Sequence, residues 1–399
     1  MFITRYSRYL PLILVLLFLA SCGNAAIQQR GVVMHEPHPD KQPDQQSDGI
    51  PTKATVLDLR QAMGLEQLIP ILVNRPVVYV GESHDNYAHH QAQLAVIDAL
   101  HESGADLAIG MEMFQQPFQQ YLDDYVAGRI TEAEMLKKTE WYDRWVYDYR
   151  LYQPILEYAK SKSIPVIALN VPREVTRRVS EVGLDGLNEE ERSQVPVEID
   201  NSDQAYRERL KKIFNQHGKE ISSDFERFLQ VQLVWDEGMA ARAADYLQAH
   251  PDKQMVVLAG SGHLMHRSGI PNRVQRRHPV SSAVVLPGGN LRVVPGVADF
   301  MLFPEQAELP PAAVLGIYME QAESGVLVSK VVKQSAADLG GVEPDDIILA
   351  FDGEQVTSPN DLRIQLLRKK PGDEAELTLL RRRVLLGEKQ LDVKLILGQ

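Results

Sequence analysis

Two short apolar runs in the chain each end at a glycine, and a histidine follows three positions after that glycine. Residues 77–80 form a β-branched run that breaks at Gly81, and His84 follows. Residues 255–259 repeat the pattern before His263. Runs of this kind predict buried strands, and in open α/β sheets ligands bind beyond the carboxyl ends of strands. We therefore expect the two histidines at one edge of one sheet.

Strand-like and helix-like patterns alternate around these runs. Further strands are predicted at 106–112, 164–170 and 282–286. Several other stretches have apolar residues at helical spacing among polar ones. Helices are predicted at 87–102, 131–160, 172–183, 202–217 and 223–249. Strands that alternate with helices imply an α/β fold, with a mostly parallel sheet covered by helices on both faces.

A second unit begins after a proline-rich break at 304–311. Its sequence Gly-Val-Glu-Pro-Asp-Asp-Ile at 341–347 resembles the PDZ domains of the bacterial protease-associated kind. The resemblance implies a small β-rich α+β domain that captures an extended peptide on a strand edge and holds its C-terminal carboxylate on backbone amides. Leu315, Gly316 and Ile317 are the predicted carboxylate loop. The alternative is a module that only docks on its own neighbour.

The N-terminus has the form of a secretory signal peptide. Arg5 and Arg8 precede an uncharged apolar segment at 10–20, which is too short to span a bilayer. The sequence Leu-Ala-Ser-Cys at 19–22 resembles the bacterial lipobox, in which the cysteine is acylated and becomes the mature N-terminus. Cys22 is the only cysteine, so no internal disulfide can form. The alternative is a cleaved signal whose cysteine is incidental.

Acylation of Cys22 would anchor the chain stably in a membrane. Gly23 replaces the aspartate that favours inner-membrane retention in such lipoproteins, so we predict the outer membrane of a Gram-negative bacterium, facing the periplasm. The polar stretch that follows predicts a flexible tether. The predicted divisions are a signal peptide at 1–21, a lipidated tether at 22–54, the α/β domain at 55–303 and the PDZ domain at 310–399.

The chain is acidic. Its formal charge over 399 residues is −12, and loss of Arg5 and Arg8 with the signal peptide makes it −14. A protein with this balance lacks the basic surface of a nucleic-acid-binding protein. Its 44% hydrophobic content is ample for more than one core. Nucleic acid is therefore excluded as a partner on bulk electrostatics.

Four residues at the expected strand ends are candidates for chemistry: Glu82, His84, Glu112 and His263. Two imidazoles with two carboxylates suit a divalent ion such as Zn, Mn or Fe(II). Alternatively, His84 is a general base that activates water without a metal, oriented by Glu82 or Glu112. A third interpretation is structural, with the histidines bonded to loop backbone and Glu82 paired with an arginine.

Other polar residues are candidates for the pocket. Asn170 ends the predicted strand at 164–170. In the predicted helix 223–249, Gln232 and Asp236 are four positions apart and share a face, and Met239 follows three positions later. We predict that these side chains form the pocket floor. The alternative is a solvated helix face.

The main domain resembles the ChaN-like haem-binding lipoproteins, part of a wider group with the TIKI/TraB proteases and the erythromycin esterases. The likeness spans about 70–290 of this sequence. The matching positions are 81–84, His89, His90, Glu112, Phe114, 164–170, Pro172, Gln232, Asp236, Met239, 259–263 and 269–271. The resemblance implies haem binding tied to iron acquisition, with a homodimer that holds haems at its interface. It does not name the haem ligand in this chain.

Haem needs an apolar slot, an axial Tyr, His or Met, and cations for its propionates. The aromatic-rich stretch 141–158 is a candidate for that slot. His89 and His90 lie in the first turn of the helix at 87–102, so we expect one of them to face the site and the other to face solvent. The alternative for 141–158 is a helix whose aromatics merely pack on the sheet. The candidate haem residues are Tyr147, Tyr149, Arg144, Arg150, His89 and His90.

Two functions of different class follow from these patterns. The first is a haem-binding lipoprotein in iron uptake. The second is a hydrolase of the protease or esterase kind, metal-dependent or based on histidine, that uses the strand-end residues. We favour the first because its resemblance covers more of the chain, and the sequence leaves open whether the protein is an enzyme.

Overall fold

The computed structural model describes residues 59–399 except 222–223, 290, 292, 384–386 and 399. The predicted signal peptide, the tether and Cys22 lie outside the described residues. None of the helices in the described part of the chain is both long enough and apolar enough to cross a membrane. The lipid anchor and the bounds of the domains therefore stay predictions.

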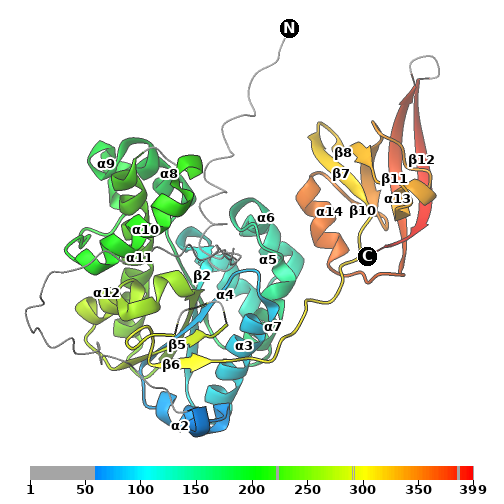
Figure 1. The fold of residues 1–399 in the computed structure, drawn as a ribbon. Helices are drawn as coiled ribbons and strands as arrows, with labels where there is room; N and C mark the ends of the chain where they lie inside the picture. The colour runs from blue at the N-terminus through cyan, green and yellow to red at the C-terminus, as the bar shows by residue number, and fades with distance from the viewer. Residues whose placement is uncertain (1–58, 222–223, 290, 292, 384–386, 399) are drawn as a thin grey trace, which may run out of the picture.

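The larger unit is built on a six-stranded sheet with helices around it (Figure 1). The strand order is β3-β2-β4-β1-β5-β6, and every pairing is parallel. The strands are β1 (Val77–Glu82), β2 (Leu107–Gln115), β3 (Val166–Asn170), β4 (Gln254–Gly260), β5 (Ser282–Pro287) and β6 (Phe300–Leu302). Strands β1 to β4 are buried along their whole length because helices cover both faces. The predicted parallel α/β architecture is confirmed.

Helices on the two faces of this sheet enclose two cores. One core contacts α2 (Leu65–Leu72), α3 (Tyr87–Glu102), α4 (Gln119–Val126), α5 (Glu132–Lys138), α6 (Trp141–Arg144) and α7 (Gln153–Ser161). The other contacts α8 (Arg173–Val182), α10 (Gln204–Ile221), α11 (Phe225–Ala249) and α12 (Ile270–Arg277), and α9 (Glu189–Ser193) joins α8 to α10. Side chains alternate along β1, so Val78 and Val80 enter the first core and Val77 and Tyr79 the second.

The region 131–160, predicted as helical throughout, is divided into α5, α6, the 3-10 helix η3 (Tyr149–Leu151) and α7. Glu140 has a φ of 52°, in the left-handed region that a continuing right-handed helix excludes. Asp148 then caps η3 with its side chain, and Pro154 lies in the first turn of α7. These interruptions place the aromatic side chains on several short segments.

The C-terminal unit is an antiparallel sheet in the order β12-β11-β9-β8-β7, with β10 paired to β9. Its strands are β7 (Ile317–Ala322), β8 (Gly325–Val331), β9 (Ile347–Phe351), β10 (Glu354–Gln355), β11 (Glu374–Arg383) and β12 (Gly387–Ile396), and its helices are α13 (Ala336–Leu339) and α14 (Pro359–Leu366). Val326, Ile348 and Leu377 are at the centre of a third core. The predicted β-rich α+β unit is confirmed, and β7 lies at the edge of its sheet.

Candidate functional site

The ends of β1 and β4 lie side by side, because Glu82 is paired in register with Gly260. The imidazole of His84 packs directly over Gly260, where an added Cβ would lie 2.9 Å from His84 Cε1 and 3.1 Å from Nε2. The amide of Gly260 donates a 2.8 Å hydrogen bond to Glu112 Oε2 on β2. This close approach requires a glycine at 260, and it brings groups from three strands together.

Glu82 and His84 form a buried carboxylate–imidazole pair, in which Glu82 Oε1 is hydrogen-bonded to His84 Nδ1. Burial opposes ionisation of Glu82, but the charge and the hydrogen bond of His84 outweigh it and lower the pKa of the carboxyl. Burial likewise opposes the charged form of His84, yet Glu82 and Glu112 together raise the pKa of the imidazole. Each partner therefore stabilises charge on the other.

His263 has its own carboxylate partner on α11. Its Nδ1 lies 2.6 Å from Asp236 Oδ1, and the hydroxyl of Tyr206 donates a 2.6 Å hydrogen bond to Asp236 Oδ2. On the other side of the ring, His263 Nε2 lies 3.5 Å from Glu112 Oε1. Burial opposes protonation, but Glu112 and Asp236 outweigh it and raise the pKa of His263 to about 9. The negative charge of Glu112 therefore raises the pKa of both imidazoles, that of His263 and that of His84.

Aromatic side chains from the segment after α6 form a wall against His84. The ring of Trp145 meets the imidazole edge-on at 5.0 Å between centroids, and the ring of Tyr147 lies at 4.9 Å. Tyr152 donates a 3.2 Å hydrogen bond from its hydroxyl to the carbonyl of His84. The imidazole is thus shielded by rings on one side and bonded to Glu82 on the other.

Several buried polar atoms at this edge of the sheet have no hydrogen-bond partner among the described residues. They are Glu82 Oε2, His84 Nε2, Asn170 Oδ1 and Gln232 Nε2. Buried polar groups in native proteins are nearly always satisfied by protein, water or a bound ion. Their concentration at strand ends and on α11 identifies this edge as the place where a ligand or ordered water would complete the bonding.

The four predicted metal ligands are already bonded within the protein. No group of three or more His, Cys, Asp or Glu side chains in the described ranges is arranged to hold a metal ion. The physical reason is the pairing: Glu82 is directed to His84 Nδ1, and Glu112 accepts the Gly260 amide. The structure therefore gives no support to the predicted Zn, Mn or Fe(II) centre at Glu82, His84, Glu112 and His263.

The two tyrosines predicted as haem ligands lie in different surroundings. Tyr149 is fully buried, and its hydroxyl donates a 2.8 Å hydrogen bond to Glu132 Oε1 inside the core. Tyr147 lies against His84 and is 8% exposed. Tyr147 is therefore the tyrosine that belongs to the site, and Tyr149 supports α5 from within the core.

His89 and His90 are both buried, so the prediction that one of them faces solvent is wrong. The amide of Ser83 donates a 3.0 Å hydrogen bond to His89 Nδ1. His90 is bonded through Nδ1 to the side chain of Gln93 and through Nε2 to the carbonyl of His84. Both side chains hold the loop between β1 and α3, because the short turn into the helix directs them back toward that loop.

The arginines predicted to bind propionates already have partners. Arg144 contacts Glu140 at 2.7 Å and Glu174 at 3.0 Å, and it donates a 2.7 Å hydrogen bond to Gln115 Oε1. Arg150 pairs with Asp148 at 2.6 Å. Each guanidinium is therefore neutralised where it lies, and a propionate would have to compete with a carboxylate.

The predicted pocket residues of α11 are buried, so a solvated helix face is wrong for Gln232, Asp236 and Met239. Met239 packs in the second core. Asn170 is buried as well, and its amide donates a 3.1 Å hydrogen bond to the carbonyl of Glu112. The polar members of this set lie behind the strand ends, as a pocket floor would.

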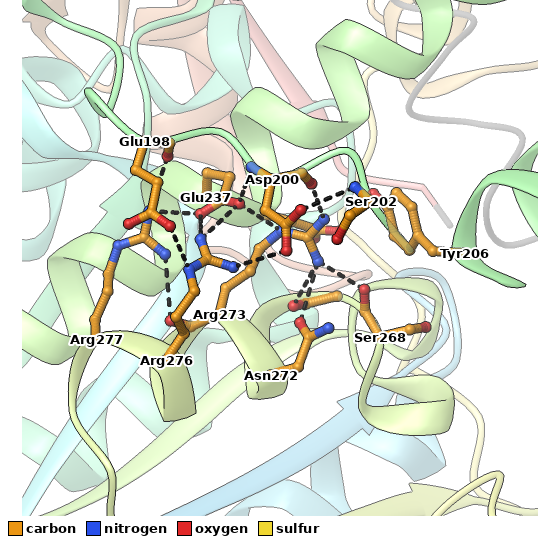
Figure 2. Close-up of polar contacts among 12 residues, drawn as sticks. Glu198, Asp200, Ser202, Tyr206, Glu237, Ser268, Asn272, Arg273, Arg276 and Arg277 are labelled. Atoms are coloured by element: carbon orange, nitrogen blue, oxygen red, sulfur yellow. Dashed lines mark hydrogen bonds and ion pairs between the residues drawn. The ribbon is translucent and has the colours of Figure 1, made fainter. Parts of the chain in front are cut away.

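A charge cluster lies directly behind Asp236, where arginines of α12 converge on Glu237 (Figure 2). Arg276 donates to both carboxylate oxygens of Glu237, at 2.9 and 2.8 Å. The guanidinium of Arg273 lies 4.8 Å from the centroid of the Tyr206 ring. A buried carboxylate needs such partners, so the cluster joins α11 to α12 beside Tyr206. Tyr206 could not be predicted from the sequence, because its contact with Asp236, 30 positions away, leaves no local pattern.

The predicted carboxylate loop of the C-terminal unit is held by its carbonyls. The carbonyl of Leu315 accepts a 2.9 Å hydrogen bond from the amide of Ala337, and that of Gly316 accepts one of 2.9 Å from Val332. Gly316 has a φ of 77°, which favours glycine. Within the described residues, the amides of Leu315 and Gly316 donate to no backbone carbonyl. Ile317 begins the edge strand β7, so loop and strand edge adjoin.

This architecture is that of a haem-binding-uptake domain followed by a peptide-binding module. Residues 68–274 match the family model described as haem-binding uptake, Tiki superfamily, ChaN, and residues 313–397 match that of the PDZ domain. The first match covers just over half of the chain, so the protein belongs to this ChaN family. The family resemblance and the PDZ domain predicted from the sequence are both confirmed.

Similar proteins match parts of this chain. The chloroplastic protein RETICULATA-RELATED 5 of Arabidopsis thaliana is 23% identical over 239 residues, which cover 54% of this chain and 31% of that protein. A probable periplasmic DegP-like serine endoprotease of Hahella chejuensis is 33% identical over 75 residues, 19% of this chain and 15% of that protein. The chain thus spans less than a third of the length of either relative.

A solved structure is similar to the larger unit. It is the structure of cofacial heme binding to ChaN of Campylobacter jejuni, with a TM-score of 0.50 and 18% identity, and the match covers 61% of this chain and 92% of that one. At this identity the similarity shows the fold alone. The sheet and its covering helices are thus those of a ChaN protein.

Proposed function

We propose that the protein is an outer-membrane lipoprotein that faces the periplasm and binds haem for iron acquisition. Its PDZ domain would bind the C-terminal or extended peptide of a partner protein. The membership of residues 68–274 in the ChaN family is the observation that supports haem binding most directly. The proposal includes the homodimer with haems at its interface that the family resemblance implies, and the Campylobacter relative is described by its cofacial heme binding.

The residues beside His84 meet two of the requirements of haem, whereas the third, free cations for its propionates, is not met by Arg144 and Arg150, which are paired with carboxylates. Haem needs an apolar surface and an axial side chain such as tyrosine. Trp145 and Tyr147 supply such a surface, and Tyr147 is the candidate tyrosine that lies there. The haem would be cargo, since its iron is the nutrient. The chain's own residues would bind it, exclude water from one face and hold the neighbouring imidazole in place.

A hemin titration of the full chain tests this proposal. Stoichiometric binding should appear as a Soret band whose position depends on the axial ligand. The variant Tyr147→Phe should shift the band and weaken binding at least tenfold. Tyr149→Phe is the matched control, because it removes a hydroxyl that is bonded inside the core. Absence of a Soret band from the wild-type chain would overturn haem binding, and equal spectra for both variants would exclude Tyr147 as the ligand.

A hydrolase is the second candidate, and the two carboxylate–imidazole pairs are the observation that favours it. His84 has Nδ1 held by Glu82, and its Nε2 has no partner among the described residues. A general base oriented by a carboxylate has this arrangement. Hydrolysis of p-nitrophenyl esters and of casein should be lost in His84→Ala and kept in His250→Ala, which changes an exposed histidine. Assays with and without added zinc or manganese would separate the histidine-based reaction from a metal-dependent one.

A further inference from the structure

Helix α14 of the PDZ domain contributes to two hydrophobic cores. Leu362 is buried in the core of the C-terminal unit, and Leu366, one turn later, packs on the same core. Ile364 is only 7% exposed, but it packs in the core of the larger unit, and Leu367 adjoins it there. Residues three and four apart share a face of a helix. The two faces of α14 are therefore buried against different domains.

Ile364 and Leu367 form an apolar seam between α14 and the larger unit. Polar contacts surround this seam. Lys137 of α5 lies 2.8 Å from Asp361, and Asn360 donates a 2.8 Å hydrogen bond to Asp143 of α6. Figure 1 shows α14 beside α5 and α6. The ion pair is partly buried, because Lys137 lies largely in solvent while Asp361 is buried, and Ile364 adds an apolar contact beside it.

The linker between the two units is fixed as well. Arg150 donates a 2.7 Å hydrogen bond to the carbonyl of Pro310, and Leu309 packs on the core that receives Ile364. The PDZ domain is thus attached to the larger unit at the linker and at α14. Two separate attachments restrict the orientation of one domain on the other more strongly than a linker does.

On the side of the larger unit, the seam continues to His84 through aromatic contacts. Trp141 lines the cleft beneath α14, and its ring lies 5.5 Å from that of Tyr152. The hydroxyl of Tyr152 is bonded to the carbonyl of His84, and Trp145 contacts the imidazole itself. A displacement of Trp141 would therefore reach His84 through one intervening ring.

On the PDZ side, α14 adjoins the edge that binds peptides. It lies against β7, and the side chain of Gln321 on β7 donates a 2.8 Å hydrogen bond to the carbonyl of Thr357, just before the helix. A peptide that adds to an edge strand places its side chains against the neighbouring element. A peptide on β7 would therefore press on α14.

The seam also has room for movement. A cleft of about 100 Å³ lies between α14 and the α5–α6 segment, lined by Leu136, Trp141 and Ile364 together with polar side chains. Well-packed interfaces resist small displacements, whereas an unfilled space permits an alternative packing. The cleft therefore leaves unfilled space beside α14 at the seam.

We propose that α14 couples the peptide-binding edge strand β7 of the PDZ domain to the buried site around His84, so that a ligand at one changes the affinity of the other. The inference rests on the proposed function in taking His84 and its neighbours as one ligand site and β7 as the other. Coupling free energies between sites are typically equivalent to about 5-fold to 150-fold in affinity and are reciprocal. A change in either domain at the seam should therefore alter the other domain as well.

The test uses the full chain without haem or peptide. In Ile364→Ala, the indole N–H resonances of Trp141 and Trp145 should shift, and amide exchange across α5 and α6 should rise about tenfold or more. Leu366→Ala is the matched control, because it shortens a side chain of the same helix that packs on the PDZ core. It should leave both tryptophan signals in place.

The reciprocal variant changes the larger unit. Leu136→Ala removes a buried contact below the cleft, and it should raise amide exchange in α14 and β7. Changes that stay within the mutated domain in both variants would overturn the proposal. Should either variant fail to fold, Lys137→Met breaks the ion pair without touching a core, and the same readouts then decide. Because haem is absent, a chain that binds no haem would still reveal the coupling.

Discussion

Individual side chains at the site act in pairs, each made of a buried carboxylate and a buried imidazole. A buried imidazole alone would be neutral, because burial disfavours its charged form. Glu82 reverses this for His84, and Asp236 and Glu112 reverse it for His263. Replacing one partner therefore removes more than a hydrogen bond, since it leaves the other partner buried with an uncompensated charge.

The variant Asp236→Asn tests the second pair. The pKa of His263 is raised from 6.5 to about 9, so the pair stabilises the folded chain fully below pH 6.5 and loses its contribution as the pH rises through about 9. The variant should lose about 3–5 kcal/mol of unfolding free energy at pH 6, and the fall in stability between pH 6 and 9.5 should flatten. Urea unfolding at the two pH values checks both. Asp245→Asn, at an exposed position of α11, is the control.

The strand-end residues could be predicted from the sequence, because a parallel sheet brings the carboxyl ends of its strands to one edge. His84, Glu112 and His263 follow from this rule alone. Their partners could not be predicted in the same way. Tyr206 reaches Asp236 from a helix far away in the chain, and Glu174 of α8 becomes adjacent to Arg144 only when α6 and α8 pack together.

At the scale of elements, the start of α14 depends on one carboxylate. Asp361 accepts a 3.0 Å hydrogen bond from the amide of Thr357 and pairs with Lys137 of the other domain. Burial opposes ionisation of Asp361, but the bonds to Lys137 and Thr357 outweigh it and lower its pKa to about 2. Ser358 is the N-cap of α14, and the side chain of Asp361 holds the preceding Thr357 in place and joins the helix to α5.

Acid should separate the two domains at the contact between Asp361 and Lys137. The folded pKa of Asp361 lies below its usual value of 3.8, so its contribution is present above pH 3.8 and is lost as the pH falls through about 2. Small-angle scattering should show the two units separating over this interval, while circular dichroism reports whether each stays folded. Asp361→Asn should separate already at pH 5. Asp392→Asn, which changes a carboxylate on β12 far from the seam, should behave as the wild-type chain does.

Regular elements could be predicted where one local pattern dominates. The strands at 77–80 and 255–259 are continuous apolar runs, and a strand buried on both faces requires such a run. The region 131–160 was mispredicted because its aromatic spacing suits a helix, whereas Glu140 adopts a left-handed backbone conformation that no composition rule anticipates. The three residues of β6 are too short for a periodic pattern, and pairing with β5 alone defines them.

At the scale of the whole molecule, Cys22 is the predicted point of attachment to the membrane. The variant Cys22→Ala should appear in the soluble periplasmic fraction, because an acyl anchor is the membrane signal that the sequence indicates. Ser47→Ala, in the tether, should remain with the membranes. Fractionation with metabolic labelling by palmitate measures both. Sedimentation of the Cys22→Ala variant with the membranes would show that another feature holds the protein there.

Deletion of residues 310–399 tests how independent the two domains are. Each unit has its own buried core, so both parts should fold alone. The deletion also removes Ile364 from the larger unit and uncovers Leu136 and Trp141, which the full chain buries. Exposure of one aliphatic contact and its surroundings costs about 1–3 kcal/mol, so the truncated chain should unfold earlier in urea and show a red-shifted tryptophan emission.

The emission of the truncated chain separates two views of the PDZ domain. An independent module would leave the larger unit with unchanged stability, tryptophan emission and hemin affinity when it is removed. A domain that supports the rings next to His84 would change all three together, because Trp141, Tyr152 and His84 are in continuous contact. Adding the separately expressed 310–399 fragment should then restore the wild-type emission, whereas the same fragment with Ile364→Ala should not. Rescue by both fragments would exclude α14 as the connecting element.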